Sequence, residues 1–119
     1  DTGPLDPQRA SVLVEHVCLD PAGTPARTLV LAAHPDDETI GASWLLTQLP
    51  DVQVLHVTDG APLAEGAWRA AGCRTALEYA GRRRAELLAA MAAAGIEPAR
   101  CPRLGLVEGD AWRHLDTLV

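Results

Sequence analysis

The residues with the clearest chemical potential lie in one short segment, "AHPDDE" at positions 33–38. His34 offers an imidazole nitrogen, and Asp37, three residues later, offers a carboxylate oxygen. A nitrogen and a carboxylate oxygen together suit zinc, and a catalytic zinc site takes three protein ligands and leaves one position open. Asp36 projects in a different direction from Asp37, so it is free to act as a general base on the attacking water. The segment therefore predicts hydrolytic metal chemistry.

The same residues also have an ordinary structural interpretation. Acidic residues in the first turn of a helix stabilise its N-terminus, and a histidine that follows a strand often bonds only to backbone groups. Spacing alone leaves the metal site and the helix cap as equal alternatives. Asp59, in the later segment "TDGAP", is likewise either a pocket residue that contacts the substrate or a turn residue.

The segments around "AHPDDE" predict a strand followed by a helix. The short apolar run "TLVLAA" at 28–33 is typical of a strand buried on both faces. Residues 36–49 predict a helix with Ile40, Trp44 and Leu45 on its buried side, closed by Pro50.

Further along, residues 52–58 predict a second strand that is ended by "DGAP". Residues 68–95 predict a helix, either whole or in two pieces around Gly72 or Gly81, whose apolar face contains Leu87, Leu88 and Met91. Residues 102–107 predict a third strand, and a further helix is expected from Asp110.

This alternation predicts an α/β fold with a Rossmann-like parallel sheet flanked by helices. The carboxyl ends of parallel strands share one edge of a sheet, so His34, Asp36, Asp37 and Asp59 are expected to lie near one another. Residues 1–27 are expected to form an N-terminal arm and linker, in which the apolar segment 11–19 fits a strand or a short helix equally well. Residues 28–119 are expected to form the functional domain.

Composition restricts the partners and the compartment. The 119 residues carry ten basic residues, all of them arginine, against sixteen acidic ones, and the net charge of -6 argues against binding to nucleic acid. The three cysteines at 18, 73 and 101 fit neither a disulfide framework nor a CxxC metal site, and they are expected to be small core residues in a reducing compartment. No apolar run has the length of a membrane span, so a cytoplasmic location is expected.

Three segments carry a family resemblance. "AHPDDETIG" resembles the signature of the LmbE-like (PIG-L) zinc-dependent N-acetylglucosaminyl deacetylases. "HVTDGAP" resembles the second strand of that family with its loop, and "GRRRAELLAAMAAAGI" resembles its Ala-rich helix. The resemblance covers about residues 28–107 in the family's order.

The resemblance implies a metal-dependent hydrolase that removes an acetyl group from an N-acetylated amine. The substrate it implies is a small molecule, an N-acetylglucosamine-type sugar conjugate, and the cofactor is Zn²⁺ or another divalent metal. His34 and Asp37 would bind the metal, and Asp36 would be the general base.

Two further roles follow from the same resemblance. Arg83, three residues before Glu86, would contact the substrate, although an arginine in this position is also compatible with a solvated helix surface. Glu38 would support the loop through hydrogen bonds behind the metal ligands.

One feature of the family is absent from the sequence. The third zinc ligand of the family is a histidine of an "HxDH"-type motif beyond a further strand, and His114 lies in no such motif. The chain is therefore expected to be the N-terminal part of a deacetylase domain, truncated before the C-terminal half, with a C-terminal segment or a homo-oligomer completing the site. The alternative is a non-catalytic or split fragment that needs a partner.

A nucleotide-binding Rossmann domain is disfavoured. Such a domain carries a glycine-rich phosphate loop after its first strand, whereas this chain has three consecutive acids there, which would repel a phosphate.

Overall fold

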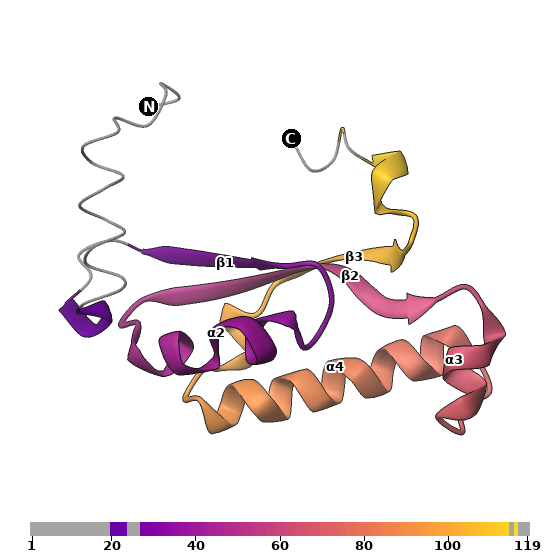
Figure 1. The fold of residues 1–119 in the computed structure, drawn as a ribbon, viewed down its shortest axis with the longest axis horizontal. Helices are drawn as coiled ribbons and strands as arrows, with labels where there is room; N and C mark the ends of the chain where they lie inside the picture. The colour runs from indigo at the N-terminus through magenta and orange to yellow at the C-terminus, as the bar shows by residue number, and fades with distance from the viewer. Residues whose placement is uncertain (1–19, 24–26, 115, 117–119) are drawn as a thin grey trace.

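The computed structural model describes residues 20–23, 27–114 and 116 (Figure 1). Its elements follow one another along the chain as the 3-10 turn Pro21–Gly23, β1 (Thr28–Ala32), α2 (Asp37–Gln48), β2 (Val52–Pro62), α3 (Glu65–Ala70), α4 (Ala76–Ala93), the 3-10 turn Pro98–Arg100, β3 (Arg103–Glu108) and the 3-10 turn Ala111–His114. The predicted element at 11–19 lies outside the described residues.

The three strands form one parallel sheet in the order β1-β2-β3, which confirms the predicted Rossmann-like α/β class. β1 and β2 pair in register from Thr28 opposite Val52 to Ala32 opposite His56. Helices α2 and α4 lie along the same face of this sheet (Figure 1). Because all strands run in one direction, their carboxyl ends meet at a single edge, where the loop that contains "HPDD" follows β1.

The hydrophobic core lies between the sheet and helices α2 and α4. α4 buries Leu87 and Met91, which confirms its predicted apolar face. Cys73 and Cys101 are buried free thiols, as expected of small core residues, and Cys18 lies outside the described residues. The main cluster of buried residues consists of Leu46, Leu49, Val52, Val54, Leu87, Met91, Ile96 and Cys101.

The predicted inner side of α2 is wrong for Ile40 and Trp44 but right for Leu45, which packs against the core. Ile40 and Trp44 are 80% and 62% exposed, whereas Leu46 and the charged residue Glu38 are buried. The hydrophobic pattern misassigns this helix because a carboxylate occupies its inner side, where a hydrogen bond from His56 compensates the loss of water.

Element boundaries differ from the predictions in two places, and at residues 68–95 the structure decides between the predicted alternatives. β2 continues to Pro62, so "DGAP" belongs to the strand; the strand accommodates it with register shifts against β3 and a positive φ of 68° at Gly60. Of the alternatives for residues 68–95, the helix in two pieces around Gly72 is confirmed: the pieces are α3 and α4, and Thr75 caps α4 by accepting a hydrogen bond from the amide of Glu78. The helix expected from Asp110 is a short 3-10 turn over the residues that the structure describes.

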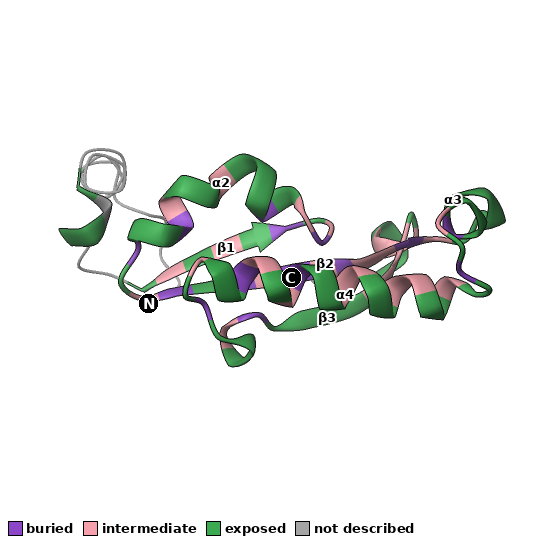
Figure 2. Ribbon diagram, turned by 90° about the horizontal axis from the view of Figure 1, so that it is seen from below, coloured by how far each residue is buried: buried purple, intermediate pink, exposed green. Residues whose placement is uncertain are grey.

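The second face of the sheet is open in the described part of the chain. Leu29 and Leu31 of β1 are 59% and 67% exposed, so the prediction of a strand buried on both faces is wrong for β1. Figure 2 shows exposed residues along β1 and on the outer side of α2. None of the described helices combines the length and the apolar composition needed to cross a bilayer.

Candidate active site at the carboxyl edge of the sheet

The turn between β1 and α2 holds a strained backbone. Asp36 has a φ of 139°, and it is the one non-glycine residue with a positive φ in the described part of the chain. Such a conformation costs about 1–3 kcal/mol and persists only where the surroundings enforce it. Asp36 occupies the N-cap position of α2, but its side chain makes no capping hydrogen bond. Its carboxylate is thus available for contacts across the turn.

His34 and Asp37 converge as the sequence predicts. The Nδ1 atom of His34 lies 3.4 Å from Oδ2 of Asp37, and the same oxygen accepts a hydrogen bond from the His34 amide at 2.9 Å. Two ligand atoms bound at about 2.1 Å to a tetrahedral zinc ion are themselves about 3.4 Å apart. The imidazole and the carboxylate therefore fit two neighbouring ligand positions of such an ion.

Glu108, at the end of β3, lies on the other side of the His34 ring. Its Oε1 atom is 3.7 Å from Nε2 of His34. The sequence analysis did not single out this residue, although the carboxyl end of the third predicted strand was expected at this edge. Within residues 20–23, 27–114 and 116, no group of three or more histidine, cysteine, aspartate or glutamate side chains is arranged to hold a metal ion.

Arg83 of α4 contacts the strained turn directly. Its Nη2 donates to Oδ2 of Asp36 at 2.7 Å and also to the carbonyl of Pro35. Burial disfavours the charge on this guanidinium, but the hydrogen bond and the attraction of Asp36 outweigh that effect and raise the pKa of Arg83 above its ordinary value. Arg83 is therefore not a solvated surface residue. Its hydrogen bond holds the carboxylate of Asp36, the expected general base.

The neighbouring arginines are directed elsewhere. Arg82 donates to the carbonyl of Ala71, and Arg84 donates to the carbonyl of Cys101. Of these three consecutive arginines, Arg83 is the one whose side chain reaches the turn between β1 and α2. The structure therefore selects the same arginine as the R-x-x-E spacing did.

Behind the turn, Glu38 and His56 form a buried pair. They are 2% and 1% exposed, and Nε2 of His56 lies 2.9 Å from Oε2 of Glu38. The same Oε2 accepts a hydrogen bond from the amide of Asp36 at 3.2 Å. Glu38 thus supports the loop through hydrogen bonds, as the resemblance implied.

The side chains of the turn border a small hollow of about 230 Å³, lined by His34, Asp36, Gly60, Arg83 and Glu108. Asp59 does not line it. Its Oδ1 accepts a hydrogen bond from the amide of Ala61 at 3.0 Å, which is the geometry of a turn residue. Asp59 borders instead a cavity of about 10 Å³ that also contacts His56 and Arg84.

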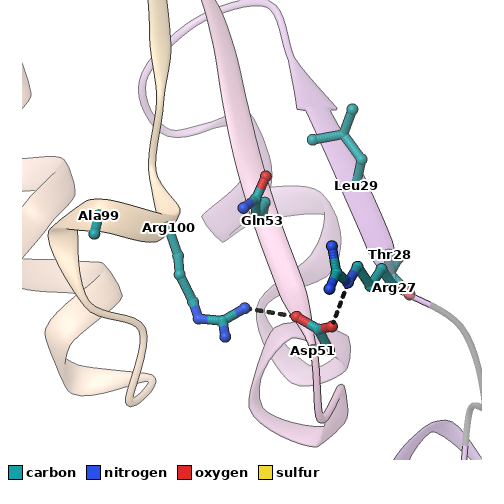
Figure 3. A pocket seen from close by; sticks show the side chains of 7 residues that line it. All are labelled: Arg27, Thr28, Leu29, Asp51, Gln53, Ala99 and Arg100. Carbon is teal, nitrogen blue, oxygen red and sulfur yellow. Dashed lines mark hydrogen bonds and ion pairs between the residues drawn. The ribbon is translucent and has the colours of Figure 1, made fainter.

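A larger hollow of about 500 Å³ lies at the opposite, amino end of the strands (Figure 3). Its one acidic residue is shared by two arginines, since Asp51 accepts a hydrogen bond from Arg100 at 2.7 Å and pairs with Arg27 at 3.3 Å. None of the residues that the sequence analysis assigned to chemistry lines this hollow.

Comparison with known proteins agrees with the arrangement at the carboxyl edge. A family model described as PIG-L, GlcNAc-PI de-N-acetylase, matches residues 29–115. The matched region contains the turn with its acids, Arg83 and Glu108. Neither the curated proteins nor the solved structures include a significant match.

Proposed function

The chain belongs to the PIG-L family of GlcNAc-PI de-N-acetylases, and we propose from this membership that it removes the acetyl group from an N-acetylated amine, with an N-acetylglucosamine-type sugar conjugate as substrate. The observation that carries the proposal is the position of the Asp36 carboxylate, which is held by Arg83 beside the His34–Asp37 pair. Metal-assisted amide hydrolysis uses a general base next to the metal ligands, which is the arrangement of these three side chains.

His34 and Asp37 would hold the metal, Zn²⁺ or another divalent ion. The 3.4 Å separation of their ligand atoms and the combination of nitrogen with carboxylate oxygen support zinc. When bound, the ion would polarise the amide carbonyl and make the attacking water more acidic. A further ligand would come from outside the described residues, from another segment or from a second copy of the chain.

Asp36 would act as the general base. Its carboxylate takes a proton from the water as the water oxygen bonds to the amide carbon. The carbon–nitrogen bond then breaks, the proton passes to the leaving amine, and acetate is released. The hydrogen bond from Arg83 holds the carboxylate at the hollow before the reaction begins.

Arg83 would also contact the substrate, because it lines the hollow next to Asp36. A sugar hydroxyl or a phosphate-bearing part of the substrate would suit its guanidinium. Asp59 is a weaker proposal for substrate binding, since it borders the smaller cavity behind the turn.

A second candidate is a non-catalytic or split fragment that requires a partner polypeptide. It is favoured by one observation: the described residues include no arrangement of three ligands for a metal. Supplying the missing ligand on a second polypeptide should then produce deacetylation where the chain alone has none.

The first test combines metal content with activity. Native mass spectrometry of the purified chain should give one zinc per chain, and acetate release from an N-acetylglucosamine conjugate should stop after chelation and return with zinc. His34→Ala and Asp37→Ala should each lose the metal, whereas His114→Ala, outside the hollow, should retain it. Acetate release that persists without any bound metal would contradict the proposed chemistry.

A further inference from the structure

His56 lies on β2, away from the hollow, yet it is connected to the reacting turn by two hydrogen bonds. We propose that His56 is a positioning residue for Asp36, acting through the buried carboxylate of Glu38. The inference rests on the proposed function, because it concerns how the general base is held. His56 itself lines no part of the hollow that contains Asp36.

The first connection joins His56 to Glu38. Nε2 of His56 lies 2.9 Å from Oε2 of Glu38, so in the tautomer that carries its proton on Nε2 the imidazole donates to this oxygen. Both side chains are almost completely buried. An unpaired carboxylate in this location would be strongly unfavourable, and the imidazole therefore fixes the position of the Glu38 side chain.

The second connection joins Glu38 to the backbone of Asp36. Oε2 of Glu38 accepts from the Asp36 amide at 3.2 Å, and Oε1 accepts from the Thr39 hydroxyl at 3.0 Å. With both oxygens engaged, the carboxylate is held on two sides. The amide that it binds belongs to the residue with the φ of 139°, so the pair is placed where a strained conformation needs support.

Core stability alone does not account for this pair. Replacing a buried ionic pair by apolar side chains of similar volume is often neutral or stabilising, so a fold gains little from burying an acid and a histidine. The pair does, however, define the direction of one hydrogen bond on the turn. A geometric role at Asp36 explains the arrangement, whereas a packing role does not.

The experiment uses two amide substitutions at position 56. The side-chain nitrogen of glutamine reaches the position of Nε2 in histidine, so His56→Gln keeps a donor for Glu38. Asparagine is shorter and its nitrogen corresponds to Nδ1, so His56→Asn keeps a polar side chain but removes the donor. The two variants carry the same amide group and differ only in the length of the side chain.

Two measurements are made on the full chain with each variant. His56→Asn should lower kcat by about 10- to 100-fold with KM within about threefold of wild type, and His56→Gln should stay within about threefold for both. Amide exchange followed by NMR should be at least about tenfold faster at Asp36 in His56→Asn alone. The amide of Glu78, which bonds to Thr75 at the N-terminus of α4 and contacts neither His56 nor Glu38, serves as the unaffected reference.

Turnover and amide exchange at Asp36 together distinguish a failure of the proposed function from a failure of the positioning role. If wild type releases no acetate, the proposed function fails, and the exchange rate at Asp36 still tests the positioning role. Equal effects of Asn and Gln, or slow turnover in His56→Asn with unchanged exchange at Asp36, would overturn the inference. If His56→Asn does not fold, Glu38→Met, which has a similar volume but offers no oxygen to His56 or to the Asp36 amide, decides by the same two measurements.

Discussion

The two edges of the sheet both gather charged side chains around a hollow, but they are built differently. At the amino edge the hollow is larger, and Asp51 is shared by the exposed side chains of Arg27 and Arg100. At the carboxyl edge the hollow is smaller, and Asp36 pairs with the half-buried Arg83. Only the second edge, among the described residues, has a strained turn with a buried polar pair behind it.

Neither the volume of a hollow nor the charged residues around it are therefore enough to identify an active site in this chain. Exposed ion pairs are common on protein surfaces and contribute little to stability. A backbone held in an unfavourable conformation by a buried carboxylate is uncommon, and such features concentrate where geometry serves function. These features support the carboxyl edge as the proposed active site, which is also the general position of ligands in open parallel sheets.

We expect the greatest loss of activity at Asp36, and the same substitution at Asp51 serves as its control. Asp36→Asn should lower kcat/KM by about 10²- to 10⁴-fold, because the amide cannot take the proton from water. Asp51→Asn, the matched change at the amino edge, should stay within about twofold. Acetate release and zinc content are measured on both, and zinc should remain bound in each. Activity retained by Asp36→Asn would remove it from the role of general base.

A second comparison concerns two glycines with similar backbone angles. Gly60 in β2 and Gly105 in β3 have φ values of 68° and 72°. A Cβ on Gly60 would lie 2.8 Å from Cδ of Pro35, whereas a Cβ on Gly105 would meet no atom within 4 Å. The two alanine variants therefore share the backbone cost and differ in whether they displace the turn.

The backbone conformation should lower the free energy of unfolding of both variants by about 1–2 kcal/mol, and Gly60→Ala should lose more because its Cβ must displace Pro35; urea denaturation measures both. Gly60→Ala should in addition lower kcat by about 100-fold, because it shifts Pro35 and with it Asp36. Gly105→Ala should stay within about threefold. Similar losses of kcat in both variants would show that the contact between Gly60 and Pro35 does not determine the position of the base.

The sequence allowed the class of fold and most of the reacting turn to be predicted. Short apolar runs that alternate with helical segments define a parallel sheet, and a parallel sheet brings strand ends together regardless of detail. The convergence of His34 and Asp37 is a local property of a turn between a strand and a helix, so their spacing was sufficient. Arg83 was found through the resemblance, because no local pattern distinguishes it from its neighbours.

The parts that could not be predicted depend on contacts between distant segments. The resemblance implied that Glu38 supports the loop, but its partner His56 on β2 could not be predicted, and this contact is what places a carboxylate on the inner side of α2. The "DGAP" segment reads as a turn, yet it continues β2 because Gly60 passes closely over Pro35. Contacts of this kind join residues that are far apart in the sequence, so they become visible only in the folded structure.

The smallest expected effect is at the amino edge. A hydrogen bond and the attraction of Asp51 raise the pKa of Arg100 above its ordinary value, but both side chains are substantially exposed. Arg100→Gln should therefore lower Tm by no more than about 3 °C, leave acetate release unchanged, and show a still smaller difference in 1 M salt, where surface pairs are screened. A larger decrease in Tm, or any decrease in acetate release, would mean that the amino edge also forms a functional site. The contrast between the two edges would then no longer hold.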